Sequence, residues 1–149
     1  QGVDMFVLDP SIGAFMLVER GLRTPKTCKS YSVNEGNRRT FPDGYQKYLD
    51  WAQEQSYSSR YVGSMVADVH RILLKGGVFM YPPTKKAPQG KLRLMYEANP
   101  MAMLMEQAGG KALAAPRQRI LDVRPTDIHQ RVPVILGSAD EVDNVVTRL

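Results

Sequence analysis

The 149-residue sequence has little of what marks several common classes of protein. Its single cysteine, Cys28, excludes an intrachain disulfide framework and a cysteine-rich zinc site, and this usage fits an intracellular protein best. No stretch approaches the roughly 18 apolar residues of a membrane-spanning helix, and no signal peptide is visible at the N-terminus. We therefore expect a cytoplasmic protein, with a plastid location also compatible with these features.

The sequence also lacks the short motifs of several enzyme classes. It contains no GxxxxGK phosphate loop, no GxGxxG, no GxSxG and no HExxH. Both histidines, His70 and His129, stand in contexts that favour a structural role, and no carboxylates have an evident two-metal spacing. The residues thus show binding chemistry without a visible reaction centre.

The composition is that of a globular domain, with 43% hydrophobic and 23% charged residues. A chain of this length can bury roughly 70% of its unfolded surface, so it needs no disulfide or metal to fold. The formal charge of +5 is concentrated, since seven basic residues accompany the single acid Asp68 between Arg60 and Arg93. This excess favours an anionic partner, and a compact phosphorylated metabolite suits it better than a nucleic acid.

The hydrophobic periodicity alternates between that of strands and that of helices, which predicts mixed α/β structure. Strands are expected at residues 5–9, 14–18, 31–33, 78–81, 92–97, 111–114, 120–123 and 134–136, the first two as a hairpin. Helices are expected at residues 44–55, 65–75, 100–108 and 139–149. Ser64, Asn99 and the Ser138–Glu141 capping box would begin the last three helices. We predict a mixed sheet of five or more strands flanked by helices.

The expected strand at residues 92–97 carries a set of charged side chains. Alternation would place Lys91, Arg93 and Glu97 on one face. Glu97 precedes a helix start and is well placed to bind a hard cation such as Mg²⁺. Lys91, about 20 Å away if the strand is fully extended, would hold a different part of a ligand. A surface ion pair between Arg93 and Glu97 is the alternative interpretation.

Other polar side chains could contribute to the same site. Arg60 offers a bidentate fork for phosphate close to the helix start at Ser64, where the helix dipole favours an anion. Tyr81 ends a strand beside the basic loop, where its ring can cover a sugar. Asn34 can hydrogen-bond a phosphate or a sugar hydroxyl, and its context also fits an ordinary turn residue.

Four segments together resemble one known family. They are GVDMFVLDPSIGAF, YSVNEG, RYVGSMVADVHRILLKGGVFMYPPTKKAPQGKLRLMYEANPMA and LDVRPTDIHQRVPVILGS. These runs resemble the C-terminal half of class I fructose-1,6-bisphosphatase, over nearly the whole chain. The resemblance implies half of a layered α-β-α-β-α fold, with residues 1–149 as a single fructose-bisphosphate-binding domain. It also implies a gluconeogenic hydrolase that converts fructose 1,6-bisphosphate to fructose 6-phosphate and phosphate with Mg²⁺, or with Mn²⁺ or Zn²⁺.

The resemblance also implies roles for individual residues. The residues expected to bind the sugar and its 6-phosphate are Asn34, Arg60, Tyr61, Met65, Tyr81 and Lys91. Arg60 would reach the phosphate of a neighbouring subunit, so a homo-oligomer, a dimer or a tetramer, is implied. Lys91 would bridge phosphate and sugar, and Met65 would contact the sugar through its backbone. Glu97 would be a ligand of the catalytic metal ion.

The sequence departs from the family pattern at Asn37, where many relatives have a phosphate-contacting tyrosine, and in the segment ALAAPRQR. The family's DPxDGS metal motif, other acidic ligands, water-activating carboxylates and AMP site belong to a half that these residues do not include. We therefore expect no catalytic residue in this chain and no activity from it alone. A non-catalytic sugar-phosphate-binding module and a sedoheptulose-1,7-bisphosphatase are the alternative functions, and we expect no nucleic-acid or membrane partner.

Overall fold

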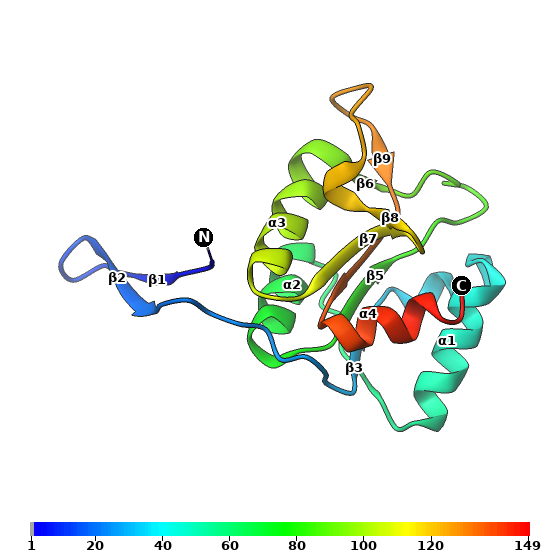
Figure 1. Cartoon of the computed structure of the whole chain (residues 1–149), viewed down its shortest axis with the longest axis horizontal. Coiled ribbons are helices and arrows are strands. Elements are labelled where there is room, and N and C mark those ends of the chain that lie inside the picture. The colour runs from blue at the N-terminus through cyan, green and yellow to red at the C-terminus, as the bar shows by residue number, and fades with distance from the viewer. Residues whose placement is uncertain (1) are drawn as a thin grey trace.

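The computed structural model describes residues 2–149 and shows a six-stranded sheet between two layers of helices, with a hairpin beside it (Figure 1). The strand order is β4-β3-β5-β10-β7-β8. These strands are β3 (Ser30–Ser32), β4 (Ser58–Ser59), β5 (Val78–Tyr81), β7 (Lys111–Ala115), β8 (Gln118–Arg119) and β10 (Val134–Gly137). Because β3 runs parallel to β4 and β5 while the other pairs are antiparallel, the sheet is mixed, as the sequence predicts.

Helices cover both faces of this sheet because neighbouring strand residues point to opposite sides. The helices are α1 (Asp43–Glu54), α2 (Met65–Lys75), α3 (Asn99–Gln107) and α4 (Ala139–Val146). On one face, α2 and α3 pack against Phe79 of β5 and Leu136 of β10. On the other face, α1 and α4 pack against Met80 and Ile135 of the same two strands. The four predicted helices thus form, with the buried residues of each in one of two cores, and α4 ends at Val146, three residues before its predicted end.

The strand predicted at residues 92–97 is wrong beyond Arg93. β6 (Leu92–Arg93) pairs with β9 (Arg131–Val132) away from the main sheet, and Leu94–Ala98 is a π-helical turn that continues into α3. Two features of the turn account for the error. The carboxylate of Glu97 accepts a hydrogen bond from the Arg93 backbone N–H at 2.7 Å. Leu94 and Ala98, four residues apart, are both buried, as a helical turn requires.

Two other parts of the chain also differ from their predicted structure. Residues 120–123 form no strand, because Ile120–Asp122 is a 3-10 helix that buries the Ile120 side chain. Glu35–Thr40 is a 3-10 helix in a stretch for which no helix or strand was predicted. Both segments are short, with six residues in Glu35–Thr40 and three in Ile120–Asp122, and one or two turns have too few residues to show a helical period.

Two of the three predicted helix starts, Ser64 and Ser138, are in the right place, but the predicted capping hydrogen bonds are absent. Ser64 and Ser138 occupy the N-cap positions of α2 and α4 without a capping side-chain hydrogen bond, and Asn99 lies inside α3 after its N-cap residue. Ser138 Oγ instead accepts a hydrogen bond from the Gly77 backbone N–H at 3.1 Å. The Glu141 carboxylate binds the segment that leads into β3. Contacts with distant segments therefore replace the local capping box.

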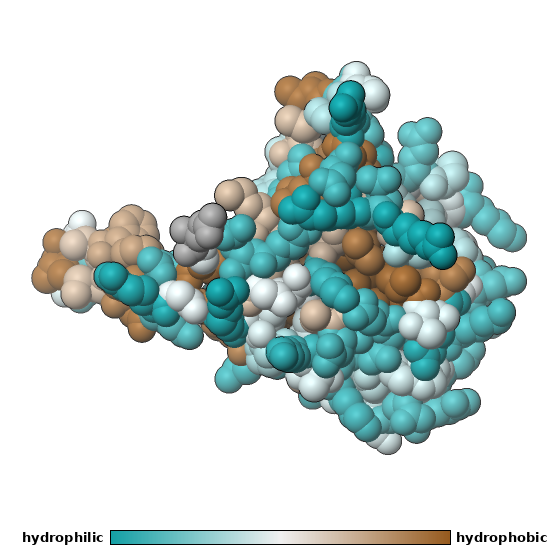
Figure 2. Space-filling model, viewed as in Figure 1, coloured by the Kyte–Doolittle hydropathy of each residue, from teal (hydrophilic) through white to brown (hydrophobic). Residues whose placement is uncertain are grey.

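The predicted hairpin of β1 (Met5–Asp9) and β2 (Ala14–Glu19) forms, and it projects from the body of the molecule (Figures 1 and 2). Its exposed apolar side chains are Phe6, Val7, Leu8, Ile12, Phe15, Met16, Leu17 and Val18. Since consecutive strand residues face opposite sides, both faces of the hairpin are apolar, which is typical of strands buried inside a larger sheet. In residues 2–149, no helix combines the length and the hydropathy that crossing a membrane requires.

Candidate functional site

Two neighbouring cavities share a wall where β5 ends and β6 begins. The small cavity has a volume of about 300 Å³, and the large cavity has a volume of about 630 Å³. Tyr81, Lys91 and Arg131 line both. The large cavity lies against the loop from Tyr81 to Lys91 and is also lined by Asn37 and Thr40. Together the two cavities could hold the two ends of one elongated ligand.

Five of the predicted site residues line the small cavity, namely Tyr61, Met65, Tyr81, Lys91 and Glu97. They come from the loop before α2, the first residue of α2, the end of β5, the residue before β6 and the π-helical turn. Lys91 and Glu97 meet at one cavity because the chain turns after Arg93. The separation of about 20 Å, which assumed a fully extended strand, therefore does not apply.

Asn34 and Arg60 lie at the edge of this group. Asn34 lines a narrow third cavity together with Asn37 and Tyr81, and its Oδ1 accepts a hydrogen bond from the Gly36 backbone N–H at 3.2 Å. Arg60 is exposed and lines none of these three cavities, and its Nη1 donates to the carbonyl oxygen of Ser59 at 3.1 Å. The structure thus brings Asn34 close to Tyr81, whereas Arg60 points elsewhere.

The small cavity is rich in positive charge. Lys91, Arg93 and Arg131 line it, with Glu97 as its acidic lining residue. Arg93 and Arg131 lie directly opposite each other in the β6–β9 pair, an arrangement of like charges that needs an opposite charge nearby. Arg93 Nη1 lies 3.6 Å from Glu97 Oε2, so the ion pair weighed as an alternative is present at the site itself. The balance of charges suits an anionic ligand.

Arg131 is a site residue that the sequence analysis missed. It follows Arg93 by nearly forty positions in the sequence, and only the pairing of β6 with β9 brings it to the cavities. Its guanidinium donates a hydrogen bond to the carbonyl oxygen of Lys91. Gly90, which has a φ of +83°, permits this approach, because a Cβ there would lie 2.3 Å from the carbonyl carbon of Val132. No local signal in the sequence indicates this contact.

Tyr61 is suited to donate a hydrogen bond into the small cavity. Burial raises the pKa of its hydroxyl, and the nearby Tyr81 and Asp68 raise it further. The hydroxyl therefore keeps its proton at neutral pH. A neutral O–H is a donor that a phosphate oxygen can accept.

Glu97 fits one part of a metal site and not the whole of it. Its side chain is 25% exposed and lines the small cavity, and its Oε2 accepts the Arg93 hydrogen bond. A carboxylate has a second oxygen, and hard divalent cations prefer oxygen ligands. Residues 2–149 contain no group of three or more His, Cys, Asp or Glu side chains that could hold a metal ion. The part of the chain described here can thus supply one metal ligand at these cavities.

Comparison with known proteins relates the chain to one family. Residues 24–149 match the family described as fructose-1-6-bisphosphatase, C-terminal domain. The class 1 fructose-1,6-bisphosphatase of Chloroherpeton thalassium is 55% identical over 148 residues, which cover 95% of this chain and 42% of that protein. The corresponding protein of Chlorobium chlorochromatii is 53% identical over 147 residues, which cover 95% of this chain and 44% of that one.

Solved structures give the same relationship. Leishmania major fructose-1,6-bisphosphatase in holo form matches with a TM-score of 0.95 at 49% identity, over 99% of this chain and 46% of that chain. Its T-state structure matches with a TM-score of 0.96 over the same shares of the two chains. The chain therefore spans less than half the length of the relatives that it matches.

Proposed function

The chain belongs to the fructose-1,6-bisphosphatase family, whose C-terminal domain it matches, and we propose that it is the substrate-binding half of an enzyme that hydrolyses fructose 1,6-bisphosphate. The products are fructose 6-phosphate and inorganic phosphate, a step of gluconeogenic carbohydrate metabolism. The observation that carries the proposal is the small cavity, which is lined by three cations, Lys91, Arg93 and Arg131, and by a single carboxylate, that of Glu97. A dianionic phosphate and a divalent cation suit these two kinds of group.

The far end of the substrate is assigned to the surroundings of Tyr81, which lines the small, the large and the narrow third cavity. We place the 6-phosphate among Asn34, Tyr61 and Tyr81, with Lys91 bridging phosphate and sugar. The protonated Tyr61 hydroxyl and the Lys91 ammonium both donate, and a phosphate dianion accepts. Met65, at the first position of α2, contacts the sugar.

The near end of the substrate is assigned to Glu97. Its carboxylate is one ligand of the divalent metal, Mg²⁺ or alternatively Mn²⁺ or Zn²⁺, which when bound stabilises the charge on the transferring phosphoryl group. Arg93, close to the same carboxylate, orients it through the backbone hydrogen bond and the ion pair. The remaining acidic ligands and the group that activates water come from outside these residues.

We further propose that the enzyme is a homo-oligomer in which Arg60 binds the 6-phosphate in a neighbouring subunit. Arg60 is exposed and lies away from the cavities of its own chain. The exposed apolar side chains of Val62 and Val66, at 65% and 62%, follow it in sequence. An exposed cation beside apolar side chains is a composition found at protein interfaces. The number of subunits and the cytoplasmic location stay predictions.

Replacement of Lys91 by alanine in the complete enzyme is expected to raise KM for fructose 1,6-bisphosphate by roughly 10- to 150-fold. The loss of one charge-assisted hydrogen bond weakens binding by about 1.5–3 kcal/mol. Steady-state kinetics at saturating Mg²⁺ measures the change. Lys85→Ala is the matched control, since Lys85 lies in the same loop and lines neither cavity. Equal KM values for the two variants would place the phosphate elsewhere.

Replacement of Glu97 by glutamine is expected to lower kcat by roughly 100-fold and to raise the Mg²⁺ concentration needed for half-maximal activity. An amide is a weaker ligand than a carboxylate, and the loss of one electrostatic stabiliser has about this effect on turnover. Activity is measured across a Mg²⁺ titration. Glu54→Gln, at the exposed end of α1, is the control. A variant with unchanged metal dependence contradicts the ligand assignment.

A comparison of substrates separates this function from its alternatives. The complete enzyme is supplied in turn with fructose 1,6-bisphosphate and sedoheptulose 1,7-bisphosphate, and kcat/KM is measured for each. We expect the larger value for the fructose ester. A larger value for the sedoheptulose ester would identify the sister activity, and binding of fructose 6-phosphate without any turnover would identify a non-catalytic module.

A further inference from the structure

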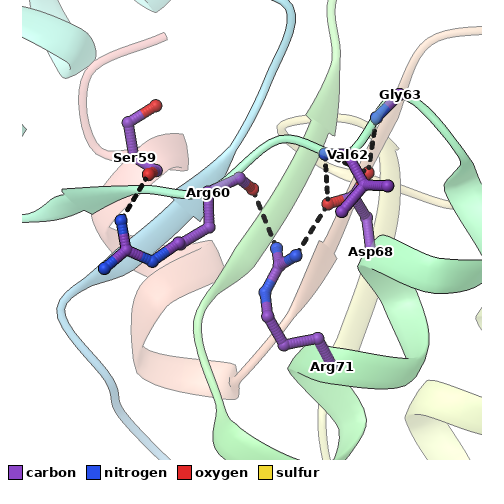
Figure 3. Close-up of polar contacts among 6 residues, drawn as sticks. All are labelled: Ser59, Arg60, Val62, Gly63, Asp68 and Arg71. Atoms are coloured by element: carbon purple, nitrogen blue, oxygen red, sulfur yellow. Dashed lines mark hydrogen bonds and ion pairs between the residues drawn. The ribbon is translucent and has the colours of Figure 1, made fainter.

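A buried carboxylate lies beneath the loop that carries Arg60 and Tyr61. Asp68, in the first turn of α2, is fully buried. It accepts hydrogen bonds from the backbone N–H of Val62, at 3.1 Å to Oδ1 and 3.2 Å to Oδ2, and from that of Gly63 at 3.2 Å (Figure 3). A buried charge requires such partners, so the carboxylate and the loop form one unit.

Arg71, one turn further along α2, connects the same carboxylate to the start of the loop. Its Nη1 donates to Asp68 Oδ1 at 2.9 Å, and its Nη2 donates to the carbonyl oxygen of Arg60 at 2.8 Å (Figure 3). The planar guanidinium makes both bonds at once because its donors form a fixed fork. An ammonium group is more compact and has no such fork.

These bonds fix the backbone on both sides of Tyr61. The carbonyl of Arg60 belongs to the peptide group before Tyr61, and the N–H of Val62 belongs to the peptide group after it. Each peptide group is planar, so anchoring both leaves little freedom in the two backbone dihedrals of Tyr61. The anchored backbone therefore sets the direction of the Tyr61 Cα–Cβ bond, from which the side chain reaches the small cavity.

The same anchors also set the direction of Arg60. In Figure 3 its side chain points away from Asp68 and Arg71, toward Ser59. Ser59 is held in turn, since its Oγ donates to Glu35 Oε1 at 2.9 Å, and Glu35 directly follows Asn34. One anchored loop thus presents Tyr61 on one side and Arg60 on the other.

We propose that Asp68 and Arg71 are positioning residues that hold Tyr61 and Arg60 in place for binding the far phosphate of the substrate. This inference rests on the proposed function, in which Tyr61 serves its own subunit and Arg60 a neighbour. A shift of the loop therefore weakens two phosphate sites in the oligomer at once. Neither Asp68 nor Arg71 lines the small or the large cavity, so neither touches the reacting end of the substrate.

The test is the kinetics of Asp68→Asn in the complete enzyme. The amide keeps the shape of the side chain, yet it has only one acceptor oxygen and no charge for Arg71. We expect KM for fructose 1,6-bisphosphate to rise about tenfold while kcat stays within about twofold, the pattern of lost binding that ground state and transition state share. Fructose 6-phosphate, which carries the far phosphate, is expected to lose affinity by the same factor in calorimetric titration.

Two further variants keep the outcome decisive. Arg71→Lys retains a positive charge near Asp68 but lacks the forked donors of the guanidinium. We therefore expect a smaller rise in KM than for Asp68→Asn. This variant tests the proposal if Asp68→Asn does not fold. Asp143→Asn changes an exposed carboxylate of α4 that pairs with Lys111, and it is expected to leave KM unchanged. The proposal is overturned if the Asp68 and Arg71 variants yield less folded enzyme but the folded enzyme keeps the wild-type KM. That result would mean that the two residues have a purely structural role.

Lys91→Ala separates this inference from the proposed function. If the wild-type enzyme binds no fructose 6-phosphate, the proposed function itself fails. If binding occurs and Lys91→Ala weakens it while both Asp68→Asn and Arg71→Lys bind like the wild type, only the positioning role fails.

Discussion

The 149-residue chain by itself is expected to bind fructose 6-phosphate and to release no phosphate from fructose 1,6-bisphosphate. Residues 2–149 bring one predicted metal ligand, Glu97, to the cavities, and they contain no group of three or more side chains that could hold a metal ion. A divalent cation that stabilises phosphoryl transfer needs several oxygen ligands at once. Binding, in contrast, uses the cations and tyrosines that the chain already provides.

Phosphate release in the presence of Mg²⁺, with the complete protein as the positive control, measures the first half of this expectation. Calorimetric titration with fructose 6-phosphate measures the second half. The chain with Glu97→Gln serves as a control for contaminating phosphatase, because a contaminant is unaffected by that substitution. The expectation is contradicted if the unmodified chain releases phosphate in a metal-dependent way and Glu97→Gln abolishes that release. Such a result would show that the residues at these cavities are sufficient for hydrolysis.

The exposed hairpin matters for the design of this experiment. Both of its faces are apolar, and apolar patches of this kind are covered in a folded assembly or promote aggregation. Phe6 and Phe15 are 53% and 69% exposed. The substitutions Phe6→Ser and Phe15→Ser are expected to keep the chain in solution without altering the cavities.

Local periodicity was sufficient to predict the helices and the hairpin, because both signals repeat within one element. The helix at Met65–Lys75 has the predicted bounds, and Asp43–Glu54 differs by one residue at each end. The turn after Arg93 could not be predicted in this way. The Asn99 backbone N–H donates to the Leu94 carbonyl and closes a single π-helical turn, which is too short for its period to be distinguished from strand alternation.

The candidate site could be predicted only in part, for a related reason. Tyr81 and Lys91 flank a conspicuous basic loop, so composition alone draws attention to them. Arg131 belongs to a separate segment, and its place beside Lys91 depends on strand pairing that no local pattern encodes. Asp68 is likewise unremarkable in sequence, because an acid near the start of a helix has an ordinary explanation in the helix dipole.

Replacement of Glu141 by alanine is expected to lower the free energy of unfolding by about 2–4 kcal/mol, a large fraction of the roughly 5–15 kcal/mol typical of a domain. Glu141 is fully buried in α4. Its carboxylate accepts hydrogen bonds from the Thr27 hydroxyl, from the Cys28 backbone N–H at 2.9 Å and from the Tyr57 hydroxyl at 2.8 Å. Alanine removes the acceptor of all three bonds. The Cys28 N–H and the Tyr57 hydroxyl are half-buried, and a buried donor left unsatisfied is destabilising by about 1–3 kcal/mol, whereas the exposed Thr27 hydroxyl can bond to water instead.

Glutamine at the same position separates charge from hydrogen bonding. Burial raises the pKa of Tyr57, and its hydrogen bond to Glu141 raises it further, so its hydroxyl is a donor at neutral pH. The glutamine carbonyl can still accept from Thr27 and Cys28, while the Tyr57 hydroxyl can turn to accept from the amide N–H. We therefore expect Glu141→Gln to lose less than half as much stability as Glu141→Ala. Denaturant unfolding followed by the fluorescence of the single tryptophan, Trp51, measures both changes.

Asp140→Ala is the matched control for this comparison. Asp140 precedes Glu141 in the first turn of α4 and is exposed, so its removal is expected to change stability by no more than about 0.5 kcal/mol. The contrast between neighbouring acids isolates the buried network from the general effect of negative charge near a helix start. Equal losses for Asp140→Ala and Glu141→Ala would mean that the network contributes nothing beyond the helix dipole. A large loss at Glu141 alone would show that this carboxylate holds the segment leading into β3 against α4.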